Sequence, residues 1–97
     1  MRGVAYRVLR EFAEAGHADA AEPLSAWYKA ASKAEWSSYA EVRAAFPSVD
    51  QVGNRLVFNI GGNKIRLIVV IDYVGHGLLV RFVGTHAEYD RIDPRSV

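Results

Sequence analysis

Three short runs rich in aliphatic residues, separated by two glycine-containing turns, fill the second half of the 97-residue chain. The runs are Arg55–Ile60, Lys64–Asp72 and Leu78–Gly84, and the segments between them are Gly61–Asn63 and Tyr73–Gly77. Side chains of a β-strand point alternately to its two sides, so each run offers one mainly aliphatic side. The pattern predicts two consecutive β-hairpins that form an antiparallel sheet.

The alternation divides the predicted sheet into an aliphatic face and a basic face. If the hairpins turn on Gly61-Gly62 and on Gly75-His76, the aliphatic side chains of all three strands share one side. The pairs expected from these turns are Ile60–Asn63, Asn59–Lys64, Phe58–Ile65, Val69–Phe82 and Val70–Arg81. The other side, which also takes Leu79 and Val83, then carries these polar residues: Arg55, Asn59, Lys64, Arg66 and Arg81.

The first half of the chain is alanine-rich and has the apolar spacing of amphipathic helices. We expect helices over Gly3–Ala15, Asp19–Glu35 and Tyr39–Phe46, and a short helix over Thr85–Asp93 after the strands. The expected boundary residues are Gly16 as a stop, Asp19 and Ser37 or Ser38 as caps, and Thr85 with Glu88 as a capping box. Helices packed on the aliphatic face of an antiparallel sheet make an α+β fold.

The composition predicts one globular domain over residues 1–97 and excludes several classes of protein. Hydrophobic residues make up 51% and charged residues 24%, which argues against a disordered chain. The absence of cysteine excludes disulfides and thiolate metal sites and fits a cytoplasmic location. The three histidines lie in unrelated segments, so we expect no metal. No apolar run approaches the roughly 20 residues that cross a bilayer, so we expect no membrane partner.

The basic face has two interpretations. The simpler one is that its cations keep an exposed sheet face in water. The other is anion binding, because the net charge of the whole chain is only +1 while the strands place four cations beside one acid, Asp72. Arg66 and Arg81 lie among aliphatic neighbours, and a planar guanidinium matches two phosphate oxygens.

The short terminal helix offers a second group of candidate residues. His86 and Tyr89 are three residues apart, so they share a helix face. Histidine exchanges protons near neutral pH, and a tyrosine hydroxyl can donate a hydrogen bond to a reacting oxygen. A purely structural role, with Tyr89 in the core, is the alternative; the nearby Arg81 favours the functional one. Arg91 either reaches a neighbouring phosphate or is simply solvated.

The second half of the chain contains F-P-S-V-D at 46–50, F-N-I-G-G-N-x-x-R at 58–66 and T-H-x-E-Y-D at 85–90. With these strings, the stretch from Phe46 to Asp90 resembles the HigB family of toxins, within the RelE-like superfamily of ribosome-dependent mRNA interferases. The family implies a RelE-like sheet whose concave face takes mRNA in the ribosomal A site and cuts it, which inhibits translation. It also implies a HigA-type antitoxin with a helix-turn-helix domain, and operator DNA bound only through the toxin–antitoxin complex.

The resemblance also assigns roles to residues. The family's strand arginines fall at Arg66 and Arg81, and its histidine and tyrosine fall at His86 and Tyr89, so these four are the expected catalytic residues. The residues expected to bind RNA are Arg55, Asn59, Lys64 and Arg91.

RNA cleavage without a metal needs a deprotonated 2′-hydroxyl, a stabilised phosphorane and a protonated 5′-oxygen. Guanidiniums suit the second task, while His86, Tyr89 and Lys64 all remain candidates for acid and base. We expect a 2′,3′-cyclic phosphate product and no cofactor. The alternative function is a non-catalytic module that uses the basic face to bind RNA or a protein.

Overall fold

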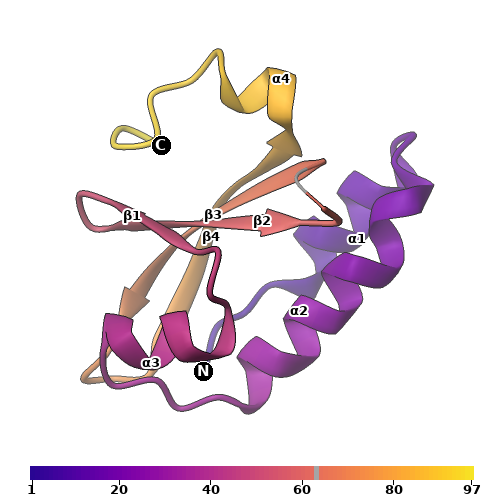
Figure 1. Cartoon of the computed structure of the whole chain (residues 1–97). Coiled ribbons are helices and arrows are strands. Elements are labelled where there is room, and N and C mark those ends of the chain that lie inside the picture. Colours follow the sequence, from indigo (N-terminus) through magenta and orange to yellow (C-terminus); the bar gives the residue numbers. More distant parts are fainter. Residues whose placement is uncertain (63) are drawn as a thin grey trace.

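The structure is a computed structural model that describes residues 1–62 and 64–97, and within them the chain forms helices around a four-stranded sheet (Figure 1). The elements in chain order are α1 (Tyr6–Glu14), a 3₁₀ turn η1 (Ala18–Ala20), α2 (Ala21–Lys33), α3 (Tyr39–Ala45), β1 (Asp50–Val52), β2 (Arg55–Ile60), β3 (Ile65–Asp72), β4 (Gly77–Thr85) and α4 (His86–Tyr89). The strands are antiparallel in the order β1-β2-β3-β4. The predicted α+β class is confirmed.

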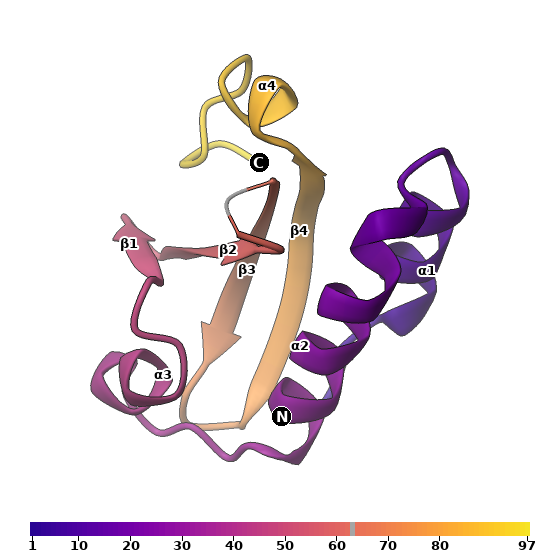
Figure 2. The same ribbon diagram turned by 45° about the vertical axis from the view of Figure 1, so that its right-hand side comes forward.

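Helices α1 and α2 lie side by side on one side of the sheet (Figure 2). Their buried apolar side chains belong to the same core as those of the aliphatic sheet face. Phe58 of β2 lies at the centre of this core. Its ring makes edge-on contacts with Trp27 of α2, at 5.4 Å between ring centres, and with Phe46 after α3, at 5.3 Å. The aliphatic face of the sheet is therefore the inside of the protein.

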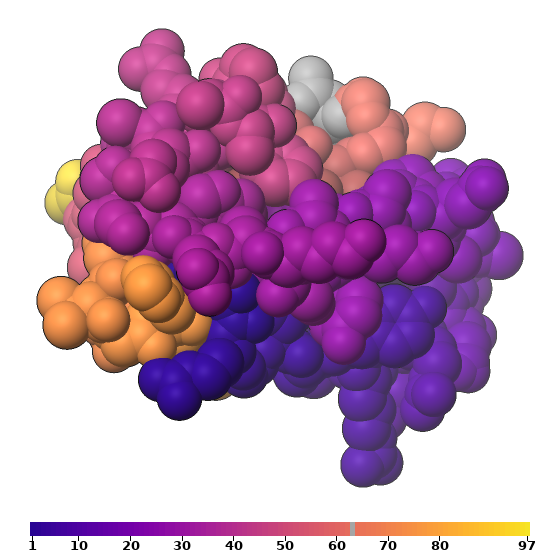
Figure 3. All heavy atoms as spheres, turned by 90° about the horizontal axis from the view of Figure 1, so that it is seen from below, coloured from indigo at the N-terminus to yellow at the C-terminus, as the bar shows by residue number. Residues whose placement is uncertain are grey.

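The two ends of β3 and β4 have different surroundings. At the hairpin turn, the segment before α1 runs along β4: the backbone N–H of Arg2 donates to His76 at 2.7 Å, and that of Leu78 donates to Arg2 at 2.8 Å. In Figure 3 this indigo segment lies against the orange hairpin turn. At the opposite end, β4 leads directly into α4 (Figure 1).

Most of the expected helix boundaries are confirmed because each carries its own hydrogen bond or backbone conformation. Ser38 accepts the N–H of Glu41 at the start of α3, and Gly16 has a φ of +97° just after α1. The prediction of Asp19 as a cap is wrong. The chain enters α2 through the turn η1, and Ala20 at its N-cap position makes no side-chain capping bond.

The first hairpin differs from the predicted register by two residues. The structure pairs Ile60–Ile65, Asn59–Arg66 and Phe58–Leu67. Of the expected partners, Asn63 lies outside the described residues. Gly61 and Gly62 have φ values of +63° and +64° in a connection longer than the two-residue turn that we expected. Because the difference is an even number of residues, β2 and β3 keep their predicted faces.

The second hairpin differs in a way that changes faces. Asp72 pairs with Gly77, so the turn is longer than the predicted Gly75-His76, and Asp72 Oδ1 accepts the N–H groups of Val74 and Gly75, both at 3.1 Å. The pairs beyond the turn are Val70–Leu79, Val69–Val80, Ile68–Phe82, Leu67–Val83 and Arg66–Gly84. A β-bulge therefore leaves Arg81 without a partner in the ladder.

The bulge reverses the side-chain alternation of β4 beyond Arg81. Phe82 joins the face of Ile68 and Arg66, whereas Val83 joins the core face of Leu67. The predicted pairs of Phe82 and Arg81 are wrong, as is the predicted side of Phe82 and of Val83. An inserted strand residue moves every later side chain to the opposite face. The prediction assumed a strict two-residue alternation, which has no place for such a residue.

Candidate active site

The sheet face that points away from α1 and α2 contains the candidate site, and we call it the cationic face, defined by Arg55, Asn59 and Arg66. Asn59, Arg66 and Gly84 form one row across β2, β3 and β4. The face is partly covered, because Val57 and Ile68 in the next row are 3% and 0% exposed. Other parts of the protein therefore cover some of this face, and only the remainder is accessible to solvent.

Arg66 and Tyr89 lie together where this face meets α4. The central guanidinium carbon of the half-buried Arg66 is 5.7 Å from the centre of the Tyr89 ring. A cation over an aromatic face at this distance is attracted by the ring quadrupole, by about 0.5–1 kcal/mol at partly exposed sites. Strand β3 supplies the arginine and α4 supplies the tyrosine, so the fold joins two residues far apart in sequence.

The short helix α4 is fixed at its start by a capping box. Thr85 Oγ1 accepts the N–H of Glu88 at 3.2 Å, and Glu88 Oε1 accepts the N–H of Thr85 at 2.8 Å, as the sequence predicts. The backbone N–H of His86 also donates to the carbonyl of Lys64, at 3.2 Å. These bonds tie α4 to the ends of β3 and β4 and so determine where Tyr89 lies. The helix ends at Tyr89, earlier than the expected Asp93.

The carboxylate of Glu88 is stabilised in its charged form. The N–H of Thr85 holds the pKa of Glu88 below its ordinary value; the Thr85 hydroxyl, His17 and Arg91 also lower it, and desolvation offsets part of the effect. At neutral pH Glu88 is thus an ionised cap that serves α4.

His86 has a partner within its own helix. Its Nδ1 lies 3.1 Å from Oδ2 of Asp90, four residues later, and both side chains are more than half exposed. A carboxylate beside one ring nitrogen favours the tautomer that carries its proton there, and Nε2 is then the nitrogen that can accept a hydrogen bond. His86 and Asp90 thus have the arrangement of an oriented acid or base.

The other expected site residues divide into exposed cations and residues that hold neighbouring segments. Lys64, Arg81 and Arg91 are exposed. Lys64 Nζ lies 3.9 Å from Asp19, and within the described part of the chain Arg81 forms no ion pair or side-chain hydrogen bond. The structure therefore does not join Arg81 to the Arg66–Tyr89 pair by any such bond.

Arg55 and Asn59 bind the main chain of other segments. Arg55 Nε donates to the carbonyl of Val97 at 2.9 Å, Nη2 donates to the same oxygen, and Nη1 donates to Asn54 at 2.6 Å. Asn59 Nδ2 donates to the carbonyl of Ser48 at 3.2 Å. Both side chains shape the cationic face by holding the segments before β1 and after α4.

Phe82 and Gly84 belong to this face, although the sequence analysis did not place them there. A Cβ atom built on Gly84 would lie 2.5 Å from Cζ and 3.0 Å from Cε1 of Phe82. The ring of Phe82 therefore folds over Gly84, directly across from Arg66. A glycine inside a strand often marks such a close approach, so Gly84 is the sequence feature that indicates this arrangement.

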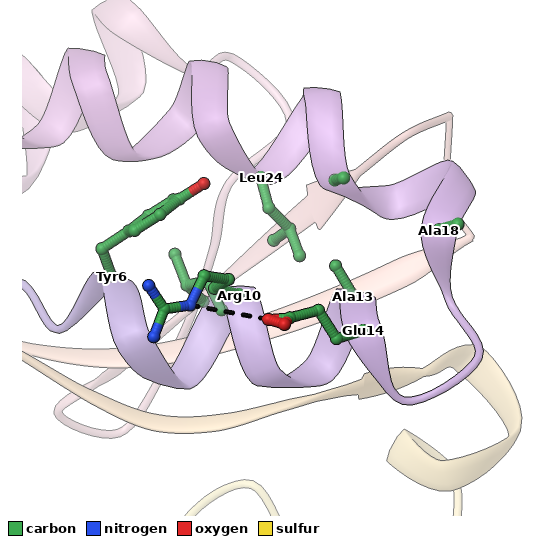
Figure 4. Close-up of a pocket in the computed structure, with 8 residues that line it drawn as sticks. Tyr6, Arg10, Ala13, Glu14, Ala18 and Leu24 are labelled. Atoms are coloured by element: carbon green, nitrogen blue, oxygen red, sulfur yellow. Dashed lines mark ion pairs between the residues drawn. The ribbon is translucent and has the colours of Figure 1, made fainter.

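The structure contains a concavity of about 220 Å³ between α1 and α2 (Figure 4). Its lining is mostly apolar, and its two charged residues, Arg10 and Glu14, pair with each other at 3.6 Å. A neutral apolar groove does not suit the charged backbone of a nucleic acid. In the described residues we also find no cluster of three potential metal ligands and no helix of the length and apolarity that a membrane span requires.

Comparison with known proteins gives a consistent result. The family described as "HigB_toxin, RelE-like toxic component of a toxin-antitoxin system" matches residues 20–92, which include every candidate residue above. The mRNA interferase HigB of Escherichia coli O6:H1 is 33% identical over 72 residues, covering 71% of this chain and 70% of the relative. The mRNA interferase toxin HigB of E. coli K12 and the mRNA interferase HigB of Shigella flexneri are each 36% identical over 52 residues, half of each chain.

Proposed function

The chain belongs to the HigB family of RelE-like toxins of toxin–antitoxin systems, and from this we propose that it is a ribosome-dependent endoribonuclease that cuts translated mRNA. The observation that carries the proposal is the pairing of Arg66 with Tyr89 beside the His86–Asp90 pair. RNA cleavage by an internal hydroxyl requires a base, an acid and a positive charge, and an imidazole, a phenol and a guanidinium can supply them. A module that only binds RNA would not need an oriented imidazole.

The reaction that we propose is attack of a ribose 2′-oxygen on the adjacent phosphorus. The bond to the 5′-oxygen of the next nucleotide breaks, and the products are a 2′,3′-cyclic phosphate and a 5′-hydroxyl. Negative charge on the phosphorane rises in the transition state, and Arg66 supplies a fixed positive charge to meet it. Electrostatic stabilisation of this kind is often the largest single contribution to catalysis.

We assign the two proton transfers to the residues of α4. Asp90 orients His86 so that Nε2 can accept the proton of the 2′-hydroxyl, and the hydroxyl of Tyr89 can protonate the leaving 5′-oxygen. The resulting roles are base for His86, acid for Tyr89 and phosphate stabilisation for Arg66. We propose a lesser role, in charge stabilisation, for the exposed Arg81.

Binding of mRNA then depends on the charges around this site. We propose that the exposed Lys64 and Arg91 contact the phosphates on either side of the cut, whereas Arg55 and Asn59 act by shaping the face. A net charge of +1 gives weak attraction to free RNA, so alignment in the ribosomal A site must supply most of the positioning. The partners that complete this proposal are a HigA-type antitoxin and, through it, operator DNA, all in the cytoplasm.

The experiment that tests the proposal combines growth with mapping of mRNA ends. Expression of the parent chain should arrest growth and produce new 5′ ends within translated regions, and the Arg66→Ala and Tyr89→Phe variants should lose both effects while they stay folded. Arg7→Ala is the matched control, because Arg7 is an exposed arginine of α1 that pairs with Glu11 at 2.8 Å.

Two results would contradict the proposal. Growth arrest without mRNA cleavage would favour a binding module, and cleavage of free RNA as efficient as cleavage on ribosomes would exclude ribosome dependence.

A further inference from the structure

We propose that Phe82 is a positioning residue of this active site, and that a base next to the scissile phosphate stacks on its ring. The inference rests on the proposed function, since it concerns the same site and the same RNA substrate. It assigns a role in substrate recognition to a residue that the alternation of the sequence would bury in the core.

Phe82 lies on the same sheet face as Arg66. The β-bulge at Arg81 turns Phe82 to the face that carries Arg66, where it forms one cross-strand row with Val57 and Ile68. Without the bulge, Phe82 would point toward α1 and α2.

The ring of Phe82 extends over Gly84. Its outer atoms occupy the space above Gly84, at 2.5 Å and 3.0 Å from where a Cβ would lie. Gly84 pairs with Arg66, and directly opposed residues of an antiparallel pair have Cβ atoms about 5 Å apart. The ring of Phe82 therefore reaches the level of the Arg66–Gly84 pair, near the end of β4 that leads into α4.

Phe82 and Arg66 together offer an aromatic ring beside a cation. Phe82 is only partly buried, so its ring belongs to the surface that a substrate meets, and Arg66 lies beside it. Proteins that hold single-stranded RNA combine such aromatic platforms for the bases with cations for the backbone. An aromatic ring one residue position from the proposed phosphate site is thus placed to fix the base that adjoins the cut.

A purely structural role is the competing explanation, because Phe82 also pairs across the strands with the fully buried Ile68. The two roles respond differently to substitution. A structural role requires only an apolar side chain of similar volume, whereas stacking requires an aromatic ring. Phe82→Leu and Phe82→Tyr therefore separate them.

The experiment measures cleavage of a short mRNA bound in purified ribosomes, together with the melting temperature of each variant. Loss of one base stack should lower cleavage by Phe82→Leu roughly 5- to 150-fold, with Phe82→Tyr close to the parent. Leu79→Ala is the control, since Leu79 is 52% exposed on the same strand before the bulge.

Each outcome has a defined meaning. Rescue by tyrosine but not by leucine, with a changed preference for the base at the cut, supports stacking. Parental cleavage by folded Phe82→Leu overturns the inference, and so does a loss that Phe82→Tyr shares or that simply follows the melting temperature. If the parent cleaves and Arg66→Ala does not, such a result leaves the proposed function intact; if the parent never cleaves, both proposals fail.

Discussion

Replacing Thr85 by valine should loosen α4 without unfolding the protein. Valine keeps the branched shape of Thr85 but removes the oxygen that accepts the N–H of Glu88. Loss of an N-cap costs about 1 kcal/mol, which is a factor of about 5 in the equilibrium between the formed and the frayed helix. Because α4 has four residues and none of them is buried, the loss should favour local opening of α4 and not unfolding of the whole domain.

The direct measurement is amide hydrogen exchange in α4. The N–H of Asp90 donates to His86 at 3.0 Å, and that of Arg91 donates to Glu88 at 3.1 Å, so both amides report on the formed helix. In Thr85→Val we expect these two amides to exchange about 5-fold faster. The amide of Leu67, in the middle of the sheet, should exchange at the parental rate. Cleavage should fall by no more than the same factor, because the groups that we propose to be catalytic are unchanged.

Two results would refute this reasoning. If Asp90 and Arg91 exchange at their parental rates, the capping box does not hold α4 in place. If Leu67 accelerates as much as Asp90 does, α4 opens only when the whole domain unfolds, and its small buried area is then irrelevant.

Three further predictions follow from other parts of the structure. The pKa of Glu88 is lowered in the folded protein. The capping stabilisation is therefore complete above the pKa of an unfolded glutamate and is lost as the pH falls through the lower folded value. The NMR shift of the Thr85 amide should report this transition, and Glu88→Gln should abolish it. Phe58→Ala should lower the free energy of unfolding by about 3–5 kcal/mol in urea titrations, because Phe58 is 1% exposed between two aromatic rings. Asp19→Asn should change that free energy by less than about 0.5 kcal/mol and leave growth arrest intact, since its ion pair is exposed.

The sequence predicts those parts of the fold that depend on local signals. Ser38, Gly16 and the Thr85–Glu88 box each act within a few residues of chain, so their effects can be read directly from the sequence. The sequence does not predict strand β1, because its three residues are too few to show an alternation. Asp19 was misassigned because the 3₁₀ turn that precedes α2 removes the need for a side-chain cap.

The candidate site divides in the same way. Arg66 and Tyr89 belong to the motifs at 58–66 and 85–90, from which the sequence predicts them as site residues, and the fold brings them together. The partners of Arg55 and Asn59 are carbonyl oxygens of Val97 and Ser48. Any residue can supply a carbonyl oxygen, so no pattern of side chains predicts such bonds. Whether a cation faces RNA or holds the protein's own backbone is therefore decided by tertiary structure.

The bulge in β4 shows why the composition of a strand can conceal its register. From Leu78 to Val83 every residue except Arg81 is apolar, so a regular strand and a bulged strand offer the core equally hydrophobic sets. The structure places the smaller Val83 against the fully buried Leu67 and moves the larger Phe82 to the other face, where Gly84 leaves room for its ring. The two-residue period does not distinguish these two arrangements, and it is the bulge that brings an aromatic ring beside Arg66.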